Sequence, residues 1–339
     1  MQRILVAPGD GVGPEVTSAA LHVVEALGLD LELVPAVVGR ESLLEHGEHI
    51  TDETVELAKQ VDAVLFGATE SPPPGVPYRS PLLTLRRRLD LFANVRPARA
   101  LLPRLSALRP PRRLDVVIVR ENTEGLYVCR EREEGDGVVA ERLITRRASE
   151  RISTFAFDWA ARHGRGKVTC VHKANVLRRS DGLFLRTFRE VAASAPAGIA
   201  HDDAHVDTAA AMMVQSPGSF DVIVTSNLFG DILSDLAAGL VGGLGFAPSA
   251  NIGERHALFE PVHGSAPGIA GRGVANPTAA ILSAAMMLDH LGHAAEAERV
   301  ERAVTAALRA GAATRDAGGR HSTMGFAKAV RRNLGGARG

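Results

Sequence analysis

The sequence is poor in cysteine and aromatic residues, and it has no excess of charge of either sign. Two cysteines, Cys129 and Cys170, occur in 339 residues. A disulfide framework is therefore not expected, and a reducing compartment such as the cytoplasm is indicated. Thirty-nine basic residues balance 39 acidic ones, so no overall field would attract nucleic acid or an anionic membrane. Because aromatics are only 4%, the core must consist mostly of leucine, valine and alanine.

Long apolar runs are also missing. The run at residues 4–7 has the length of a buried strand and is too short for a signal-peptide core. No stretch is long enough to cross a bilayer as a helix, so no membrane partner is expected. A chain of 339 residues exceeds the size at which a single core usually stops growing, and two domains are predicted.

Apolar runs of strand length alternate with helical patterns along the chain. This alternation predicts an α/β fold with a largely parallel sheet covered by helices. The expected strands are residues 4–7, 31–38, 63–66, 116–119, 168–171 and 222–225. The expected helices are residues 14–27, 52–60, 148–162, 183–193, 230–240, 278–291 and 294–310.

A glycine-rich turn follows the first strand but does not match a dinucleotide fingerprint. Gly9 and Gly11 have the spacing of G-x-G-x-x-G, whereas Pro14 stands where the third glycine is required. Proline is favoured in the first turn of a helix. A tight strand-to-helix turn is therefore favoured over a phosphate-binding loop, and the fold is not expected to be a Rossmann fold.

Two aspartates, Asp231 and Asp235, stand four residues apart in an apolar helical pattern. This spacing places both carboxylates on one helix face, one turn apart. In isolation such a pair is more often solvated than functional. Asp207 could add a third carboxylate, and such a set suits Mg²⁺ or Mn²⁺ better than Zn²⁺. Both interpretations remain open at this point.

Cationic side chains occur at several expected strand ends. Arg120 ends the strand at 116–119, and Lys173 follows the strand at 168–171, where α/β sheets bind ligands. With Arg86 and Arg96, Arg120 could bind a substrate that has several carboxylates. The alternative for the run 86–88 is a solvated helix face, which is expected for two of its three arginines.

Two further segments have distinctive composition. Residues 71–81 are rich in proline, which predicts a loop. Residues 130–147 alternate charged and β-branched residues around two glycines. This pattern predicts a polar hairpin that protrudes from the body and pairs with a partner chain.

Five longer motifs make the chain similar to a known family. They are RRRLDLFANVRPA (86–98), VIVRENTEGLY (117–127), HKANV (172–176), TSNLFGDILSDLAAGLVGGLG (225–245) and FEPVHGSAPGIAGRGVANPTAAILSAAMML (259–288). Together they resemble the metal-dependent β-decarboxylating dehydrogenases, which include isopropylmalate, isocitrate and homoisocitrate dehydrogenases. The resemblance covers essentially the whole chain and implies the isopropylmalate/isocitrate dehydrogenase-like fold. It also implies two interleaved domains around a mixed, largely parallel sheet: residues 1–95 with 245–339 on the cofactor side, and 96–244 for catalysis and dimerisation.

The resemblance also implies roles for individual residues, and a homodimer, possibly a tetramer, with shared active sites. Arg86, Arg96 and Arg120 would bind the malate part of the substrate. Metal ligands would be Asp231 and Asp235, with Asp207 from the other subunit. Tyr127 and Lys173 would be the catalytic pair and also contact substrate, with Lys173 supplied by the neighbouring chain. The residues implied at the cofactor are Asn175, His263, Gly264, Ser265, Ala266 and Asn276, and Asn175 would also contact the substrate.

The resemblance further implies oxidation and decarboxylation of a 3-carboxy-2-hydroxy acid. The segment before Arg86 is most similar to homoisocitrate dehydrogenases, which form 2-oxoadipate for lysine biosynthesis by the aminoadipate route. Arg79 and Ser80, with Tyr78, are candidates to bind the distal carboxylate. Leu82 and Leu83 would suit the isopropyl group of 3-isopropylmalate instead; isocitrate and tartrate or malate are further alternatives. A regulatory subunit of an isocitrate dehydrogenase is the non-catalytic alternative.

Cofactor preference depends on residues that follow the loop at 263–266. NAD-preferring members commonly place an aspartate at the position of Gly268, and NADP-preferring isocitrate dehydrogenases place lysine and tyrosine at 268 and 269. This chain has Gly268 and Ile269, so nothing positive is supplied for a 2′-phosphate. NAD is therefore the expected cofactor.

Overall fold

The computed structural model describes residues 1–72, 78–108 and 114–335. These residues form two compact units, Met1–Leu91 with Gly242–Gly339, and Phe92–Val241. Part of the proline-rich segment at 71–81, residues 73–77, lies outside the described residues. None of the helices in the described ranges is long and apolar enough to span a membrane.

The first unit is built on a mixed sheet in the order β2-β1-β3-β12-β11. The pairs β1–β2, β1–β3 and β3–β12 are parallel, and β11–β12 is antiparallel. The strands are β1 Gln2–Gly9, β2 Leu31–Pro35, β3 Ala63–Ala68, β11 Pro248–Ile252 and β12 Ala257–Pro261. The helices are α1 Gly13–Glu25, α2 Arg40–His46, α3 Asp52–Ala58, α4 Pro81–Arg88, α9 Thr278–His290, α10 Ala294–Arg309 and α11 Thr323–Asn333.

The helices of this unit pack because their apolar residues recur at helical spacing. Helix α9 is buried almost throughout, since it lies between the sheet strands β11 and β12 and the helices α1 and α10. A separate apolar cluster joins Leu5 and Phe66 of the sheet to Val55 of α3 and Leu85 of α4. Apolar burial of this kind is the main force that holds the layers together.

The second unit contains a mixed sheet in the order β4-β5-β10-β8-β9. Strands β5, β10, β8 and β9 are parallel, and β4 runs antiparallel to β5. The strands are β4 Ala93–Arg99, β5 Asp115–Glu121, β8 Lys167–His172, β9 Ala200–His205 and β10 Val222–Thr225. The helices are α5 Arg146–Arg162, α6 Ser180–Ala192, α7 Val206–Gln215 and α8 Asn227–Val241.

Side-chain alternation in β5 explains the two helical layers of this unit. Val116 and Ile118 join an apolar cluster with Met213 of α7 and Leu233 of α8. Because neighbouring strand residues point to opposite faces, Val117 points away from this cluster; α5 packs against β5, β8 and β10. The predicted α/β fold with a mixed, largely parallel sheet is confirmed.

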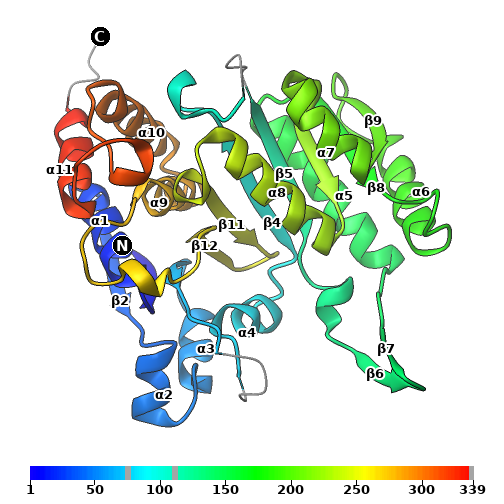
Figure 1. Ribbon diagram of the computed structural model, residues 1–339, viewed down its shortest axis with the longest axis horizontal. Coiled ribbons are helices and arrows are strands. Elements are labelled where there is room, and N and C mark those ends of the chain that lie inside the picture. Colours follow the sequence, from blue (N-terminus) through cyan, green and yellow to red (C-terminus); the bar gives the residue numbers. More distant parts are fainter. Residues whose placement is uncertain (73–77, 109–113, 336–339) are drawn as a thin grey trace. The chain divides into compact units, whose positions relative to one another are not determined.

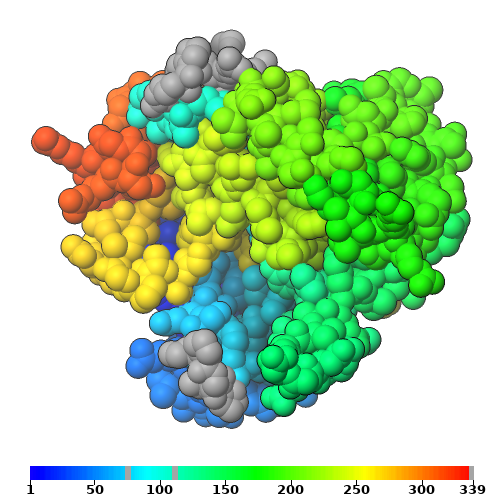
Figure 2. Space-filling view, turned by 45° about the vertical axis from the view of Figure 1, so that its right-hand side comes forward, coloured from blue at the N-terminus to red at the C-terminus, as the bar shows by residue number. Residues whose placement is uncertain are grey.

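The predicted hairpin is also present, with shorter strands than the segment 130–147. Strand β6 (Glu131–Glu134) pairs antiparallel with β7 (Gly137–Ala140), and their residues are almost all exposed. It extends beyond the body of its unit (Figures 1 and 2). The prediction was too long at its carboxyl end, because α5 begins at Arg146 with Thr145 as its N-cap.

Candidate active site

Arg120 is the charged centre of the site in the second unit. It ends β5, and only 1% of the residue is exposed. Its Nε and Nη2 atoms donate to Asn227 Oδ1 at 2.9 and 2.7 Å. Gly230 allows α8 to cover the aliphatic part of this arginine, since a Cβ there would lie 2.7 Å from Arg120 Cβ. The glycine is thus required by close packing.

Asp231 receives three donors from separate parts of the second unit. Arg120 Nη1 donates to its Oδ1 atom, and Arg96 Nη1 donates to the same oxygen at 3.2 Å. The Tyr127 hydroxyl donates to Oδ2 at 2.6 Å. The guanidinium of Arg120 also lies 4.9 Å from the centre of the Tyr127 ring. One carboxylate therefore brings together two arginines and a tyrosine.

Asp235 stands one helical turn farther along α8, as its spacing predicted. Arg96 Nη1 lies 3.3 Å from Asp235 Oδ1 and donates to Ser234 Oγ at 2.8 Å. The Asp235 side chain is 53% exposed, against 35% for Asp231. Burial raises the pKa of Asp235 and repulsion from Asp231 raises it further, whereas Arg96 lowers it.

The protonation of Tyr127 follows from the same surroundings. Burial raises the pKa of its hydroxyl, as does the hydrogen bond to Asp231, while the charge of Arg120 lowers it. Because phenols ordinarily titrate near pH 10, this hydroxyl keeps its proton at neutral pH. Tyr127 can therefore act as a proton donor.

The two aspartates fit a divalent cation. They supply carboxylate oxygens, which Mg²⁺ and Mn²⁺ prefer, and a cation would relieve the repulsion that raises the pKa of Asp235. Within one chain, no group of three His, Cys, Asp or Glu side chains in the described ranges could hold a metal ion.

Lys173 and Asp207 pair with each other in the second unit. Lys173 follows β8, and its Nζ donates to Asp207 Oδ1 in the first turn of α7. The hydrogen bond from Lys173 lowers the pKa of Asp207. The Asp207 side chain remains 65% exposed and that of Lys173 24%, so each retains surface that a second chain could contact.

His172 and Asn175 flank this lysine and differ in surroundings. The His172 Nδ1 atom accepts from the Ala174 amide at 3.0 Å, which leaves Nε2 to donate to Asp203 at 3.2 Å. His172 is buried and both ring nitrogens are paired, so it is a structural residue. Asn175 is exposed, and its predicted place at the cofactor remains a prediction.

Arg86 belongs to the first unit and is buried, whereas Arg87 and Arg88 are exposed. This agrees with the expectation that two of these three arginines face solvent. Arg86 Nη2 donates to Glu260 Oε1 at 2.8 Å, and Asn251 Nδ2 donates to the same oxygen at 2.8 Å. Arg86 Nε is buried and has no partner in the described residues, which leaves it available to a ligand.

The loop at 263–266, also in the first unit, rests on the glycine turn after β1. Gly11 has a φ of +60°, and the Val12 amide donates to Ser265 O at 2.8 Å. A Cβ at Gly11 would lie 2.0 Å from that carbonyl oxygen. The turn is therefore a packing feature that positions this loop, as the imperfect fingerprint indicated.

His263 fits a cofactor contact. Its Nδ1 atom lies 3.0 Å from Gly264 O, which assigns the proton to Nδ1 and makes Nε2 an acceptor. Nε2 is buried and has no partner in the described residues. Burial lowers the pKa of His263, while the Gly264 hydrogen bond raises it. A neutral imidazole with an unused acceptor suits a ligand that donates a hydrogen bond.

Asn276 lies next to a residue that the sequence analysis did not identify, Asp316. Asn276 Nδ2 donates to Asp316 Oδ2 at 3.0 Å, and its Oδ1 accepts from the Thr278 amide at 3.0 Å. Gly245 packs against Asn276 at distances that leave little room for a side chain. Asp316 lies outside the five family motifs, so only its contact with Asn276 connects it with the predicted cofactor residues.

The residues proposed for substrate choice already have partners in the first unit. Arg79 donates to Glu48 Oε2 at 2.7 Å and to Asp52 Oδ1 at 3.0 Å. The Ser80 hydroxyl caps α4 by accepting from the Leu83 amide at 3.3 Å. Arg79 would have to leave both carboxylates to bind a substrate carboxylate.

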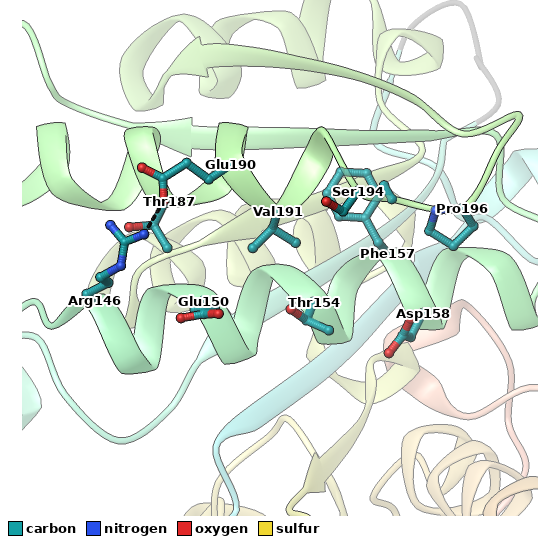
Figure 3. A pocket seen from close by; sticks show the side chains of 11 residues that line it. Arg146, Glu150, Thr154, Phe157, Asp158, Thr187, Glu190, Val191, Ser194 and Pro196 are labelled. Atoms are coloured by element: carbon teal, nitrogen blue, oxygen red, sulfur yellow. Dashed lines mark hydrogen bonds and ion pairs between the residues drawn. The ribbon is translucent and has the colours of Figure 1, made fainter.

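A further hollow of about 340 Å³ lies in the second unit between α5 and α6 (Figure 3). Arg146, Glu150 and Glu190 line one part of it, and Phe157 and Val191 line another. None of the predicted site residues lines this hollow. The candidate active site is therefore identified by converging side chains and not by this cavity.

Comparison with known proteins is consistent with this arrangement. The family model described as isocitrate/isopropylmalate dehydrogenase matches residues 3–330. The chain is 52% identical over 330 residues to 3-isopropylmalate dehydrogenase of Archaeoglobus fulgidus, covering 97% of this chain and 98% of the relative. It is 53% identical over 329 residues to isocitrate/homoisocitrate dehydrogenase of Thermus thermophilus, covering 97% of each.

A solved structure supports the same assignment. Isocitrate dehydrogenase from Methylococcus capsulatus superposes with a TM-score of 0.93 at 44% identity, covering 98% of this chain and 99% of that one. The matches extend over nearly the full length of both chains. The chain belongs to the isocitrate/isopropylmalate dehydrogenase family of decarboxylating hydroxy-acid dehydrogenases.

Proposed function

We propose that the protein oxidises and decarboxylates homoisocitrate to 2-oxoadipate, with NAD and Mg²⁺ or Mn²⁺ as cofactors, in lysine biosynthesis by the aminoadipate route. The observation that carries the reaction class is the convergence of Arg96, Arg120 and Tyr127 on Asp231. The homoisocitrate assignment is supported by the similarity of residues 78–97 to homoisocitrate dehydrogenases. A relative named isocitrate/homoisocitrate dehydrogenase at 53% identity also supports it.

The arginines would bind the carboxylates of the substrate. Arg96 and Arg120 are largely buried and contact Asp231 in the second unit, and Arg86 retains an unpartnered Nε in the first. Guanidinium groups bind carboxylates with two parallel hydrogen bonds. Their burial strengthens such contacts, because water competes less for the charge.

Asp231 and Asp235, with Asp207 of a second copy, would hold the divalent cation. When bound, this cation would stabilise negative charge on the C2 oxygen, and the nicotinamide would accept the hydride from C2. Lys173 of the partner copy would take the proton of the C2 hydroxyl. The β-keto acid then loses the C3 carboxylate as CO₂, and Tyr127 would return a proton to that carbon.

NAD would bind in the first unit at His263, Gly264, Ser265, Ala266 and Asn276, with Asn175 of the second unit near the nicotinamide. Glycine has no side chain, and no described residue beyond its chain neighbours lies within 4 Å of the position that a Cβ would take at Gly268. The chain therefore offers no side chain at this position to bind or repel a 2′-phosphate. The preference for NAD is supported by this lack of a cationic group at 268 and 269.

A homodimer is proposed because the Lys173 and Asp207 roles require a second copy. Val214 of α7 and Ile232 of α8 are 46% and 58% exposed, and apolar groups on adjacent helices suit a protein interface. The exposed hairpin β6–β7 would pair with its counterpart. A tetramer of two such dimers is compatible with this scheme, and the two free cysteines are compatible with a cytoplasmic location.

An assay of NAD reduction with Mg²⁺ over homoisocitrate, 3-isopropylmalate, isocitrate and malate tests the substrate. Homoisocitrate should give the highest kcat/KM, and NADP should be the poorer cofactor. 3-Isopropylmalate is the second candidate, favoured by the partly buried Leu82 and Leu83; a higher kcat/KM for it would reject the homoisocitrate assignment. The absence of activity with all four acids would support a regulatory subunit instead, although Asp231, Lys173 and Tyr127 are all present.

Arg79 is tested separately, with Arg88 as its control. Both arginines contact Asp52, so loss of either removes a comparable surface ion pair. Arg79→Ala should raise KM for homoisocitrate at least tenfold more than KM for 3-isopropylmalate, because a hydrogen bond to a charged group contributes about 1.5–3 kcal/mol. Arg88→Ala should change neither KM. Equal effects of Arg79→Ala on both substrates would reject this role.

A further inference from the structure

The main chain at Lys173 is held by a buried ion pair between Arg142 and Asp181, two residues that have no role in the proposed reaction. The Lys173 amide donates to Asp181 Oδ2 at 2.6 Å, and the Lys173 carbonyl accepts from the Leu177 amide at 2.8 Å. Asp181 lies in the first turn of α6, and only 1% of it is exposed. Both polar groups of the Lys173 backbone are therefore fixed.

The charge of Asp181 is balanced by Arg142, which follows the hairpin. Arg142 Nη1 donates to Asp181 Oδ1 at 2.5 Å and to Ser180 Oγ at 3.2 Å. The Arg142 side chain is 15% exposed and that of Asp181 is 2% exposed. A carboxylate this deeply buried needs its cation, because an unpaired buried charge is strongly unfavourable.

Arg142 also reaches the junction between β10 and α8. Its Nη2 donates to Ser226 Oγ at 3.1 Å, and the guanidinium lies 5.3 Å from the centre of the Phe229 ring. Phe229 precedes Asp231 by two residues on α8. The next residue after Arg142, Leu143, forms a β-bridge with Gly125, two residues before Tyr127. Arg142 thus links the hairpin to the segments that carry Lys173, Asp231 and Tyr127.

We propose that Arg142 and Asp181 are positioning residues for Lys173, and that their ion pair couples the placement of the hairpin to the placement of that lysine. This inference rests on the proposed role of Lys173. A misplacement of about 1 Å can cost a catalytic group about 10²-fold in rate. Loss of the pair should therefore lower kcat through Lys173 while substrate binding by the arginines persists.

The test compares Asp181→Ala and Arg142→Met with Arg165→Gln in the full-length protein. Arg165 bridges Asp115 and Asp221 in the same unit, and neither aspartate has a proposed role at the site. The substrate is the most active acid of homoisocitrate, 3-isopropylmalate and isocitrate, with NAD and Mg²⁺. Asp181→Ala and Arg142→Met should lower kcat about 10–100-fold with KM changed less than about threefold, whereas Arg165→Gln should lower only the Tm.

Two further variants separate this inference from the proposed function. Arg142→Lys keeps a cation beside Asp181 and should restore at least part of the kcat that Arg142→Met loses. Adding Asp181→Ala to Lys173→Ala should cause no further loss, because Asp181 acts through Lys173. If Lys173→Ala retains full kcat, the proposed role of Lys173 fails.

If Lys173→Ala is inactive but the Asp181 and Arg142 variants keep the kcat of Arg165→Gln, the positioning inference is overturned and the proposed function stands. Should Asp181→Ala not fold, the ratio of kcat between Arg142→Lys and Arg142→Met decides the question. Equal kcat values for those two would overturn the inference.

Discussion

The two ends of the sheet in the second unit both gather arginines and aspartates, but they balance these charges differently. At the amino end, Arg165 donates to Asp221 Oδ1 at 2.9 Å and to Asp115 Oδ1 at 2.7 Å. The other oxygen of Asp221 accepts from the Gly166 amide at 2.7 Å. Arg165, Asp115 and Asp221 therefore each have a close partner, and the cluster links the starts of β5, β8 and β10.

At the carboxyl end of the sheet, the charged side chains lie close together, but one carboxylate remains exposed to solvent. Asp231 collects Arg96, Arg120 and Tyr127, while Asp235 has Arg96 at 3.3 Å and remains half exposed. Its raised pKa reflects burial and the repulsion from Asp231. Parallel strands bind ligands beyond their carboxyl ends, where the connecting segments diverge. The two clusters therefore differ in exposure and not in a shortage of cations, because the side chains of Asp115 and Asp221 are 19% and 26% exposed, against 53% for Asp235.

The largest difference between the two ends of the sheet is expected when Asp231 is replaced. Asp231→Asn should lower kcat/KM about 10³-fold, since loss of metal-stabilised charge costs about 4 kcal/mol. It should also abolish any rise in Tm on addition of MgCl₂ that the wild-type protein shows. Steady-state kinetics and thermal melts with and without MgCl₂ measure both effects. Retention of more than a tenth of the activity would contradict the assignment.

Tyr127 provides the next largest effect. Tyr127→Phe removes the proton donor and should lower kcat about 10²-fold, within the range for general acid catalysis. Because the arginines and both aspartates remain, the dissociation constant of the substrate should change little. Titration calorimetry and kcat measurements on the same preparation separate these outcomes. A tenfold rise in the dissociation constant of the substrate with unchanged kcat would show that Tyr127 contributes to binding only.

Arg165 tests the opposite end of the sheet. Arg165→Gln leaves Asp115 and Asp221 without their cation and should lower the free energy of unfolding by about 2–3 kcal/mol, less than for a fully buried pair. The Arg165 side chain is 23% exposed, which justifies the reduced figure. Below the melting transition, kcat/KM should stay within about twofold of wild type. Urea unfolding measures the free energy of unfolding, and steady-state kinetics measure kcat/KM. A large loss of kcat/KM would contradict a purely structural role for the cluster at the amino end of the sheet.

Glu124 provides a prediction about how the free energy of unfolding depends on pH. Burial raises the pKa of Glu124 to about 6, although hydrogen bonds from Thr145 lower it. Protonation thus favours the folded state: the stabilisation is complete below pH 4.5, the ordinary value, and is lost as the pH rises through about 6. Glu124→Gln should be more stable than wild type at pH 8 by up to about 2 kcal/mol. At pH 4.5 the two proteins should differ little, and a difference independent of pH would contradict this assignment.

Much of the fold was predictable because its signals are local. The i, i+4 spacing of Asp231 and Asp235 predicted one helix face, and α8 spans Asn227–Val241. Short apolar runs likewise identified β5, β8 and β10, and a helical apolar pattern identified α9. Strand β9 was missed because its sequence, AHDDAH, is polar and almost wholly exposed. Helices α2, α4, α7 and α11 and strands β4, β11 and β12 were also not predicted.

The sequence by itself determined the family, the α/β alternation and the identity of the chemical groups, since these depend on neighbouring residues and long motifs. Only the tertiary structure decided which charges meet. Arg120 and Asp231 are 111 residues apart, and Arg142 and Asp181 are 39 apart. Local periodicity carries no information about such pairs. Packing of the strands and helices brings them together, and burial then makes each unpaired charge costly enough to require its partner.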